Sequence, residues 1–131
     1  GDMHGAHGLF RKGWPHEESV RVPLLVRHPM EAARRDESAV SLLNLPAMTL
    51  AWADGHLWRC PRLTAEISMP SVVRLPQQCD RVWHGVRSPA RKLVFNADGT
   101  PWLFFDLERD PLELSNLAAD PAHAAEMAAM M

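Results

Sequence analysis

The 131-residue sequence contains no tyrosine, only two cysteines and no excess of positive charge. Lysine and arginine number 14 against 16 aspartates and glutamates, which gives a formal net charge of −2. Nucleic-acid binding needs a basic surface that neutralises phosphates, so this balance predicts no nucleic-acid partner. No apolar run approaches the roughly 20 residues that cross a bilayer, and the start, Gly1-Asp2-Met3-His4, lacks the features of a signal peptide. The sequence therefore predicts no membrane partner, and it does not indicate a compartment.

The two cysteines carry little information about chemistry. Cys60 and Cys79 allow at most one disulfide, and the sequence does not decide whether they pair. Neither belongs to a C-x-x-C pair or has a neighbouring histidine, so no zinc site is predicted. The apolar share of 47 % is ordinary for a globular protein. The first residue is not methionine, which suggests that the chain begins inside a longer one.

Short elements separated by prolines are expected along the chain. Residues 19–27 are β-branched and bounded by proline, which predicts a strand, with Pro23 at an edge or a bulge. A helix is predicted over 45–53, because Asn44 can cap it, Pro46 suits its first turn and Asp54-Gly55 ends it.

The β pattern strengthens toward the C-terminus. Residues 82–86 predict a strand, and 92–107 predict a hairpin whose turn carries Asp98-Gly99. The continuous apolar run 102–105 predicts a strand covered on both faces. A last helix is predicted from 122 to the end, whereas 56–75 reads as irregular chain with short extended pieces.

The histidine-rich start offers candidate chemistry. A carboxylate and three imidazoles could form a metal site; these are Asp2, His4, His7 and His16. The spacing of His4 and His7 suits ligands only on a helix, and the surrounding glycines disfavour one, so a polar loop at a cleft is the preferred interpretation. A solitary lysine in a loop, such as Lys12, is usually solvated. Composition and spacing alone predict only a mixed α and β fragment.

Four segments of the sequence nevertheless match motifs of one known protein family. Residues 1–24, GDMHGAHGLFRKGWPHEESVRVPL, resemble a sulfatase segment that starts S-D-H-G-D and continues H-G-x-x-x-K-x-x-x-x-E-E-S-x-R-V-P. Residues 83–94 resemble the R-x-V-R-T-x-x-x-K-L strand pair, and 99–117 resemble the closing W-x-L-Y-D-L-E-x-D-P-x-E-x-x-N-L. Residues 40–54 are similar to a helix entry of the same family.

The resemblance implies a fold and a chemistry. It implies an α/β fold of the alkaline-phosphatase-like type, with this chain as the C-terminal portion carrying a small antiparallel sheet and a terminal helix. Residues 1–55 would end the catalytic domain, and 56–131 would form a C-terminal subdomain. Sulfatases hydrolyse sulfate esters with a formylglycine made in a C/S-x-P-S-R motif beside bound Ca²⁺, which is covalent, metal-assisted catalysis.

Site residues carry over where they match the motif. Lys12 matches the lysine that contacts a sulfate oxygen and the leaving-group side, and His7 matches a histidine at the cleft, where it would contact the substrate. Asp2 follows the D-H-G triplet, whose calcium ligands would precede Gly1, so Asp2 would lie behind the metal ligands. Glu17 and Arg21 would hold the loop onto the sheet rather than touch substrate.

The departures from the pattern limit what the chain can do. Neither cysteine is followed by x-Pro-Ser-Arg, and the paired aspartates of the calcium site are missing, so the chain alone is predicted to be inactive and to hold no metal. The expected substrate is a small-molecule or glycan sulfate ester. The alternatives are a phosphonate monoester or phosphodiester hydrolase of the same superfamily, and a non-catalytic binding module or pseudoenzyme fragment.

Overall fold

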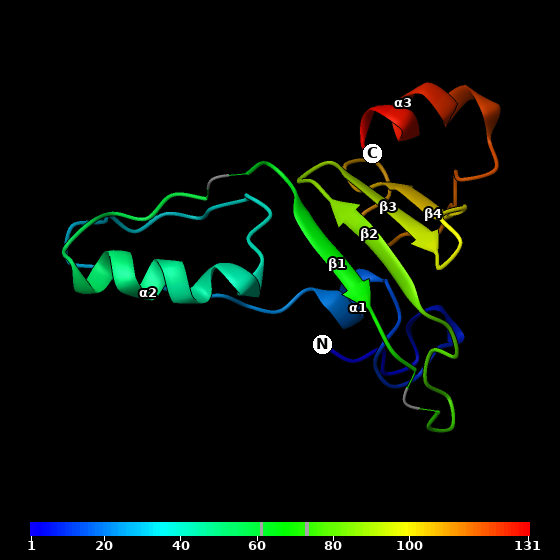
Figure 1. Cartoon of the computed structure of the whole chain (residues 1–131), viewed down its shortest axis with the longest axis horizontal. Helices are drawn as coiled ribbons and strands as arrows, with labels where there is room; N and C mark the ends of the chain where they lie inside the picture. Colours follow the sequence, from blue (N-terminus) through cyan, green and yellow to red (C-terminus); the bar gives the residue numbers. More distant parts are fainter. Residues whose placement is uncertain (61, 73) are drawn as a thin grey trace.

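A four-stranded antiparallel sheet lies at the centre of the molecule (Figure 1). The computed structural model describes residues 1–60, 62–72 and 74–131. The strands follow one another in the sheet in chain order; they are β1 (Ala65–Met69), β2 (Trp83–Arg87), β3 (Arg91–Asn96) and β4 (Pro101–Asp106). A small antiparallel sheet followed by a terminal helix is the architecture predicted for this portion of the fold, and it is confirmed.

The β3–β4 hairpin forms where the turn residues predicted it. Gly99 has a φ of +83°, which a glycine adopts without a steric penalty. The side chain of Asp98 accepts a 2.9 Å hydrogen bond from the amide of Thr100, and the amide of Asn96 donates to the Thr100 carbonyl at 2.9 Å. A register shift between Val94 and Phe95 marks a bulge in this pair.

Both faces of the sheet are covered, as the run 102–105 predicted. Because side chains alternate along a strand, Val94 and Phe105 lie on one face, where Trp14 and Val20 of the N-terminal segment pack against them. The opposite face joins Leu93 and Phe104 to Met127 of the terminal helix. The N-terminal segment and the C-terminal helix are thus held on opposite sides of one sheet.

The strand predicted over 19–27 is not formed. The short helix α1 (Glu17–Val20) takes its first residues, and residues 21–28 continue as extended chain outside the sheet. A β-rich pattern becomes a strand only when a neighbour satisfies its backbone groups. None of the described strands runs beside this segment, and Leu25 is 95 % exposed.

The predicted helix over 45–53 is confirmed as α2 (Leu45–Ala53), preceded by the 3₁₀ turn η2 (Leu42–Asn44). Its start differs in detail, because the side chain of Ser41, not that of Asn44, accepts a capping hydrogen bond, from the amide of Leu43 at 3.3 Å. Only Met48 of α2 is buried. Figure 1 shows α2 on an arm that projects away from the sheet.

The remaining strand, β1, is one of the extended pieces within 56–75. Alanine, glutamate and serine make it a poor strand by composition, and it is a strand because it pairs with β2 from Ala65↔Arg87 to Met69↔Trp83. Pro61 and Val73, which also fall in that stretch, lie outside the described residues.

The C-terminus covers one edge of the sheet as well as one face. The predicted last helix is confirmed as η3 (Pro121–His123) and α3 (Ala124–Ala129), and Asp120 caps it by accepting from the amide of Ala122 at 2.9 Å. Before it, the amide of Leu117 donates to Phe104 O at 2.9 Å, and Asn116 Oδ1 accepts from Phe104 N at 3.0 Å, so the outer edge of β4 is occupied. Among the described residues, no helix has the length and apolar character that a bilayer span requires.

Candidate functional site

A compact, strained loop carries His7 and Lys12, the two site residues predicted from the sequence. Residues 4–13 include a 3₁₀ turn, η1 (Ala6–Gly8), and hydrogen bonds from Met3 N to Arg11 O (3.1 Å) and Gly5 N to Leu9 O (2.9 Å) close the loop. Positive φ values are concentrated here, at His4, Gly5, His7, Gly8, Arg11 and Gly13. For residues other than glycine such a backbone costs on the order of 1–3 kcal/mol each, and it persists where the surroundings enforce it, often at functional sites.

Lys12 lies at the end of this loop, exposed at a broad cleft of about 1770 Å³. The cleft is bounded by the N-terminal segment, the extended chain after α1 and strand β1. The indole Nε1 of Trp83 donates a 2.7 Å hydrogen bond to the carbonyl of Gly13. Strand β2 therefore fixes the backbone directly after Lys12, while the lysine side chain stays at the cleft.

His7 is not beside Lys12 in the cleft wall but packs on a second histidine. The rings of His7 and His16 are stacked, with centroids 4.0 Å apart and an interplanar angle of 17°. His7 Nε2 lies 3.8 Å from Glu18 Oε2, and His16 Nδ1 lies 3.2 Å from Glu113 Oε2. Two carboxylates thus flank a pair of stacked imidazoles.

Behind this pair lies a buried charge network centred on Lys92, whose side chain is fully buried. Its ammonium lies 2.6 Å from Glu113 Oε1 and 2.7 Å from Glu17 Oε1, and it donates to the carbonyl of Pro15 at 3.0 Å. Arg87 adds a 3.2 Å ion pair to Glu17. As predicted, Glu17 holds the loop onto the sheet, whereas Arg21, for which the same role was predicted, has an exposed side chain.

The charges of this network oppose the effect of burial on its carboxylates. Burial acts to raise the pKa of Glu113, but the hydrogen bond from His16 and the Lys92 charge outweigh it, so the pKa is lowered. Burial likewise acts to raise the pKa of Glu17, and Lys92 and Arg87 leave it lowered. Both groups are therefore carboxylates near neutral pH.

The predicted cluster of Asp2, His4, His7 and His16 is only partly assembled. Among the described residues, the group whose ligating atoms lie within 4.8 Å of one another is His7, His16 and Glu113. Two nitrogens and a carboxylate already paired with an ammonium do not fit Ca²⁺, which takes six to eight oxygen ligands. Glu113 was missed as a member of this cluster, although it stands in the closing motif that the resemblance covers.

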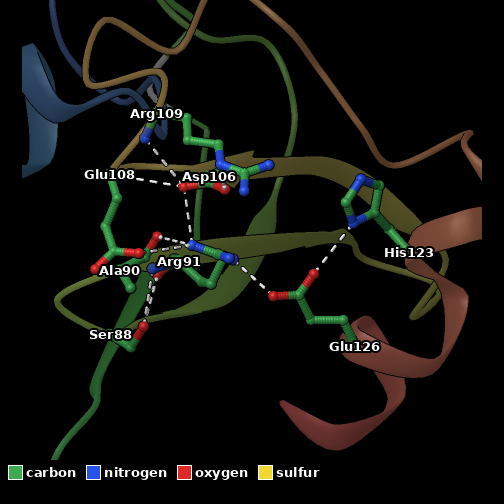
Figure 2. Close-up of polar contacts among 8 residues, drawn as sticks. All are labelled: Ser88, Ala90, Arg91, Asp106, Glu108, Arg109, His123 and Glu126. Carbon is green, nitrogen blue, oxygen red and sulfur yellow. Dashed lines mark hydrogen bonds and ion pairs between the residues drawn. The ribbon is translucent and has the colours of Figure 1, made fainter.

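A second polar cluster ties the terminal helix to the other face of the sheet (Figure 2). Arg91 donates from Nη1 to Asp106 at 2.8 Å and from Nε to Glu126 of α3 at 2.6 Å. Hydrogen bonds from His123 and Arg91 lower the pKa of Glu126, and the bond to Glu126 raises the pKa of Arg91. This cluster is separated from Lys12 by the sheet.

The cysteines take no part in either cluster. Both are free thiols, so the disulfide that the sequence left open is not formed. Cys79 is buried among core side chains, and burial raises the pKa of its thiol, which makes it a poor nucleophile.

No protein-family model matches the chain, but two curated proteins are similar to it. It is 29 % identical over 134 residues to an arylsulfatase of Clostridium perfringens, covering 89 % of this chain and 27 % of that protein. It is 29 % identical over 141 residues to a choline-sulfatase of Rhizobium meliloti, covering 99 % of this chain and 28 % of that protein. The chain thus spans less than a third of these curated relatives.

A solved structure shares the fold over nearly the whole chain. It is the structure of BT4656 in complex with its substrate D-glucosamine-2-N,6-O-disulfate, with a TM-score of 0.68 and 22 % sequence identity. The match covers 97 % of this chain and 30 % of that one. The arrangement of sheet, loop and terminal helix described above is therefore shared with a portion of a much longer protein.

Proposed function

Because this chain is related to the sulfatases over most of its length, we propose that it forms part of an enzyme that hydrolyses sulfate esters. The observation that carries the proposal is the position of Lys12. The lysine matches the family motif, ends a strained loop that the sheet holds in place, and is exposed at a broad cleft.

In the proposed reaction, Lys12 stabilises charge on the substrate. Cleavage of the S–O bond develops negative charge on the bridging oxygen of the leaving group, and the sulfate oxygens are anionic throughout. A compact ammonium held close to these oxygens favours the transition state more than the ground state. His7, which was expected to contact the substrate, does not line the cleft and would instead support the same loop through its stack on His16.

The size of the cleft supports a role as one part of a larger active site. A volume of about 1770 Å³ exceeds the roughly 300–1,000 Å³ of small-molecule pockets. One wall is the extended chain after α1, which exposes Val22, Leu24, Leu25 and Val26. We propose that further protein fills most of this space, and that a small-molecule or glycan sulfate ester occupies the part next to Lys12.

The proposed reaction also needs a nucleophile and a metal, and other parts of the whole enzyme would have to supply them. The trio of His7, His16 and Glu113 does not fit calcium, and neither cysteine stands in a formylglycine motif. We therefore propose that both the formylglycine and the Ca²⁺ ligands lie outside these residues and that the 131-residue chain alone has no turnover.

The proposal is tested first on the gene. The coding sequence upstream of Gly1 is expected to encode Ser-Asp-His directly before it and a C/S-x-P-S-R motif further upstream. A start codon in place of Ser-Asp-His, with no such motif, would instead identify an independent module.

The second test is enzymatic and uses the protein extended to include that motif. Hydrolysis of 4-nitrophenyl sulfate is expected, and Lys12→Ala should lower kcat by about 10²–10³-fold, the usual loss for one charge-stabilising donor. Arg62→Ala, at a cation 73 % exposed on its side chain, is the matched control and should keep the rate. Faster hydrolysis of a phosphonate monoester or phosphodiester would reassign the enzyme within the superfamily, and an unchanged rate for Lys12→Ala would remove this lysine from the site.

A further inference from the structure

One of the two stacked histidines, His16, contacts the buried carboxylate of Glu113. The Glu113 side chain is 1 % exposed, and its Oε1 lies 2.6 Å from the Lys92 ammonium. Its Oε2 accepts a 2.8 Å hydrogen bond from the amide of Glu17. Glu113 also has a φ of +55°, a left-handed backbone that its surroundings must enforce. Backbone, ammonium and amide together fix the position of Oε2.

This fixed oxygen sets the state of the His16 ring. An ionised carboxylate only accepts hydrogen bonds, so the contact of 3.2 Å to His16 requires a hydrogen on Nδ1. The contact therefore selects the Nδ1–H form of the ring and sets its rotation. His16 has little freedom to turn away, because it is buried, with its ring tilted against Phe105 at a centroid distance of 5.8 Å.

The His7 ring in turn rests on His16. The 4.0 Å stack gives His7 a flat support on one side, and Glu18 Oε2 lies 3.8 Å from its Nε2. The His7 backbone is left-handed, with φ of 54° and ψ of 19°, so the loop presents the ring to this support from a strained backbone conformation.

We propose that Glu113 is a positioning residue, which fixes the tautomer and rotation of His16 and, through the stacked pair, holds the loop that places Lys12 at the cleft. The catalytic half of this inference rests on the proposed function, whereas the structural half concerns the 131-residue chain itself. A metal-binding role for the same trio is less consistent with the geometry, because the Lys92 ammonium already pairs with Glu113.

The structural half is tested by long-range ¹H–¹⁵N NMR of the histidine rings in the 131-residue chain. In the native sequence His16 should show the Nδ1–H form as its dominant tautomer. Glu113→Gln keeps the shape but offers both a donor and an acceptor, so His16 should become a mixture of tautomers and the His7 ring signals should shift. Glu126→Gln, the same substitution in the cluster on the opposite face, should leave both rings unchanged.

The catalytic half is tested in the extended enzyme with 4-nitrophenyl sulfate. Glu113→Gln should lower kcat by about 10- to 100-fold with little change in KM, because misplacement of one group affects the reaction geometry more than binding. Should that variant fail to fold, His16→Phe keeps an aromatic ring under His7 and leaves the Lys92 network intact, and it should shift the His7 signals and lower kcat similarly.

Each result decides one question. Unchanged tautomers in Glu113→Gln, or ring shifts of equal size in Glu126→Gln, would overturn the positioning role. An unchanged kcat in a variant whose rings have shifted would also overturn it. If the extended enzyme with the native sequence showed no sulfatase activity, the proposed function would be rejected instead. The tautomer result for His16 would still stand.

Discussion

Arg91 and Lys92 are neighbours in β3, and their side chains hold opposite faces of the sheet. Lys92 reaches the N-terminal segment through Glu17 and the carbonyl of Pro15, whereas Arg91 reaches Glu126 of α3. The alternation of side chains along a strand turns two adjacent cations into anchors for segments from the two ends of the chain. We therefore expect the loop that carries Lys12 to depend on the first anchor and not on the second.

Removal of the Lys92 charge should be strongly destabilising. Lys92→Met would leave the buried carboxylates of Glu17 and Glu113 without the ammonium that pairs them, a change that typically costs about 3–5 kcal/mol of unfolding free energy. Urea denaturation followed by tryptophan fluorescence measures the loss. Arg62→Met breaks an exposed pair with Glu66 and should cost at most about 1 kcal/mol. Equal losses of unfolding free energy in the two variants would show that burial of the Lys92 ion pairs does not increase their contribution to stability.

Removal of the other anchor should act locally. Arg91→Leu deletes the contacts to Asp106 and Glu126, so amide hydrogen exchange over α3 should accelerate. The amides of residues 3–11, on the far side of the sheet, should keep their native protection. Hydrogen exchange read by mass spectrometry separates the two regions, and faster exchange in both would show that the anchors are not independent.

Acid should destabilise the chain through the buried carboxylates. The pKa values of Glu17 and Glu113 are lowered in the folded state below the ordinary value of 4.5, so the unfolded state binds more protons as the pH falls. Their stabilisation is complete above the unfolded pKa and is lost as the pH drops through the folded values. The unfolding free energy should therefore decrease from about pH 5 downward. Glu113→Gln should reduce this dependence, whereas the exposed Glu66→Gln should not.

Gly85 should not tolerate a side chain. A Cβ there would lie 2.4 Å from the carbonyl oxygen of Leu93 on the neighbouring strand, so Gly85→Ala must push β2 and β3 apart. Overpacking of this kind costs about 1–3 kcal/mol. Gly55→Ala is the matched control, since its φ of +75° is strained but nothing lies within 4 Å of the added carbon. Thermal unfolding should place Gly85→Ala below Gly55→Ala, and the reverse order would argue against the steric account.

Local residue chemistry made some elements predictable. The Asp98-Gly99 turn and the Asp54-Gly55 helix end carry their signals within a few residues, so the hairpin and α2 form where they were expected. Residues 19–27 carry the composition of a strand but have no neighbour to pair with among the described strands. Strand β1 shows the converse, because its pairing with β2 overrides a composition that favours other structures.

The sequence predicted which residues belong to the candidate site, but not the contacts that hold them in place. Lys12 and His7 follow from a motif, and their loop is compact as a functional loop should be; their roles remain predictions. The burial of Lys92 could not be foreseen, since a lysine in a strand is usually exposed and its partners are remote in sequence. The stacking of His7 on His16 likewise depends on how residues 4–13 fold back. Six positive φ values determine this fold, and no periodic pattern in the sequence predicts them.

The unequal edges of the sheet limit where another strand can join it. Asn116 and Leu117 bond the outer backbone groups of Phe104 in β4, whereas β1 pairs with β2 alone among the described strands and borders the cleft. A strand from the protein proposed to fill the cleft could therefore extend this sheet at β1. Such pairing would satisfy the exposed backbone edge of β1 and keep strands of other molecules from adding to it.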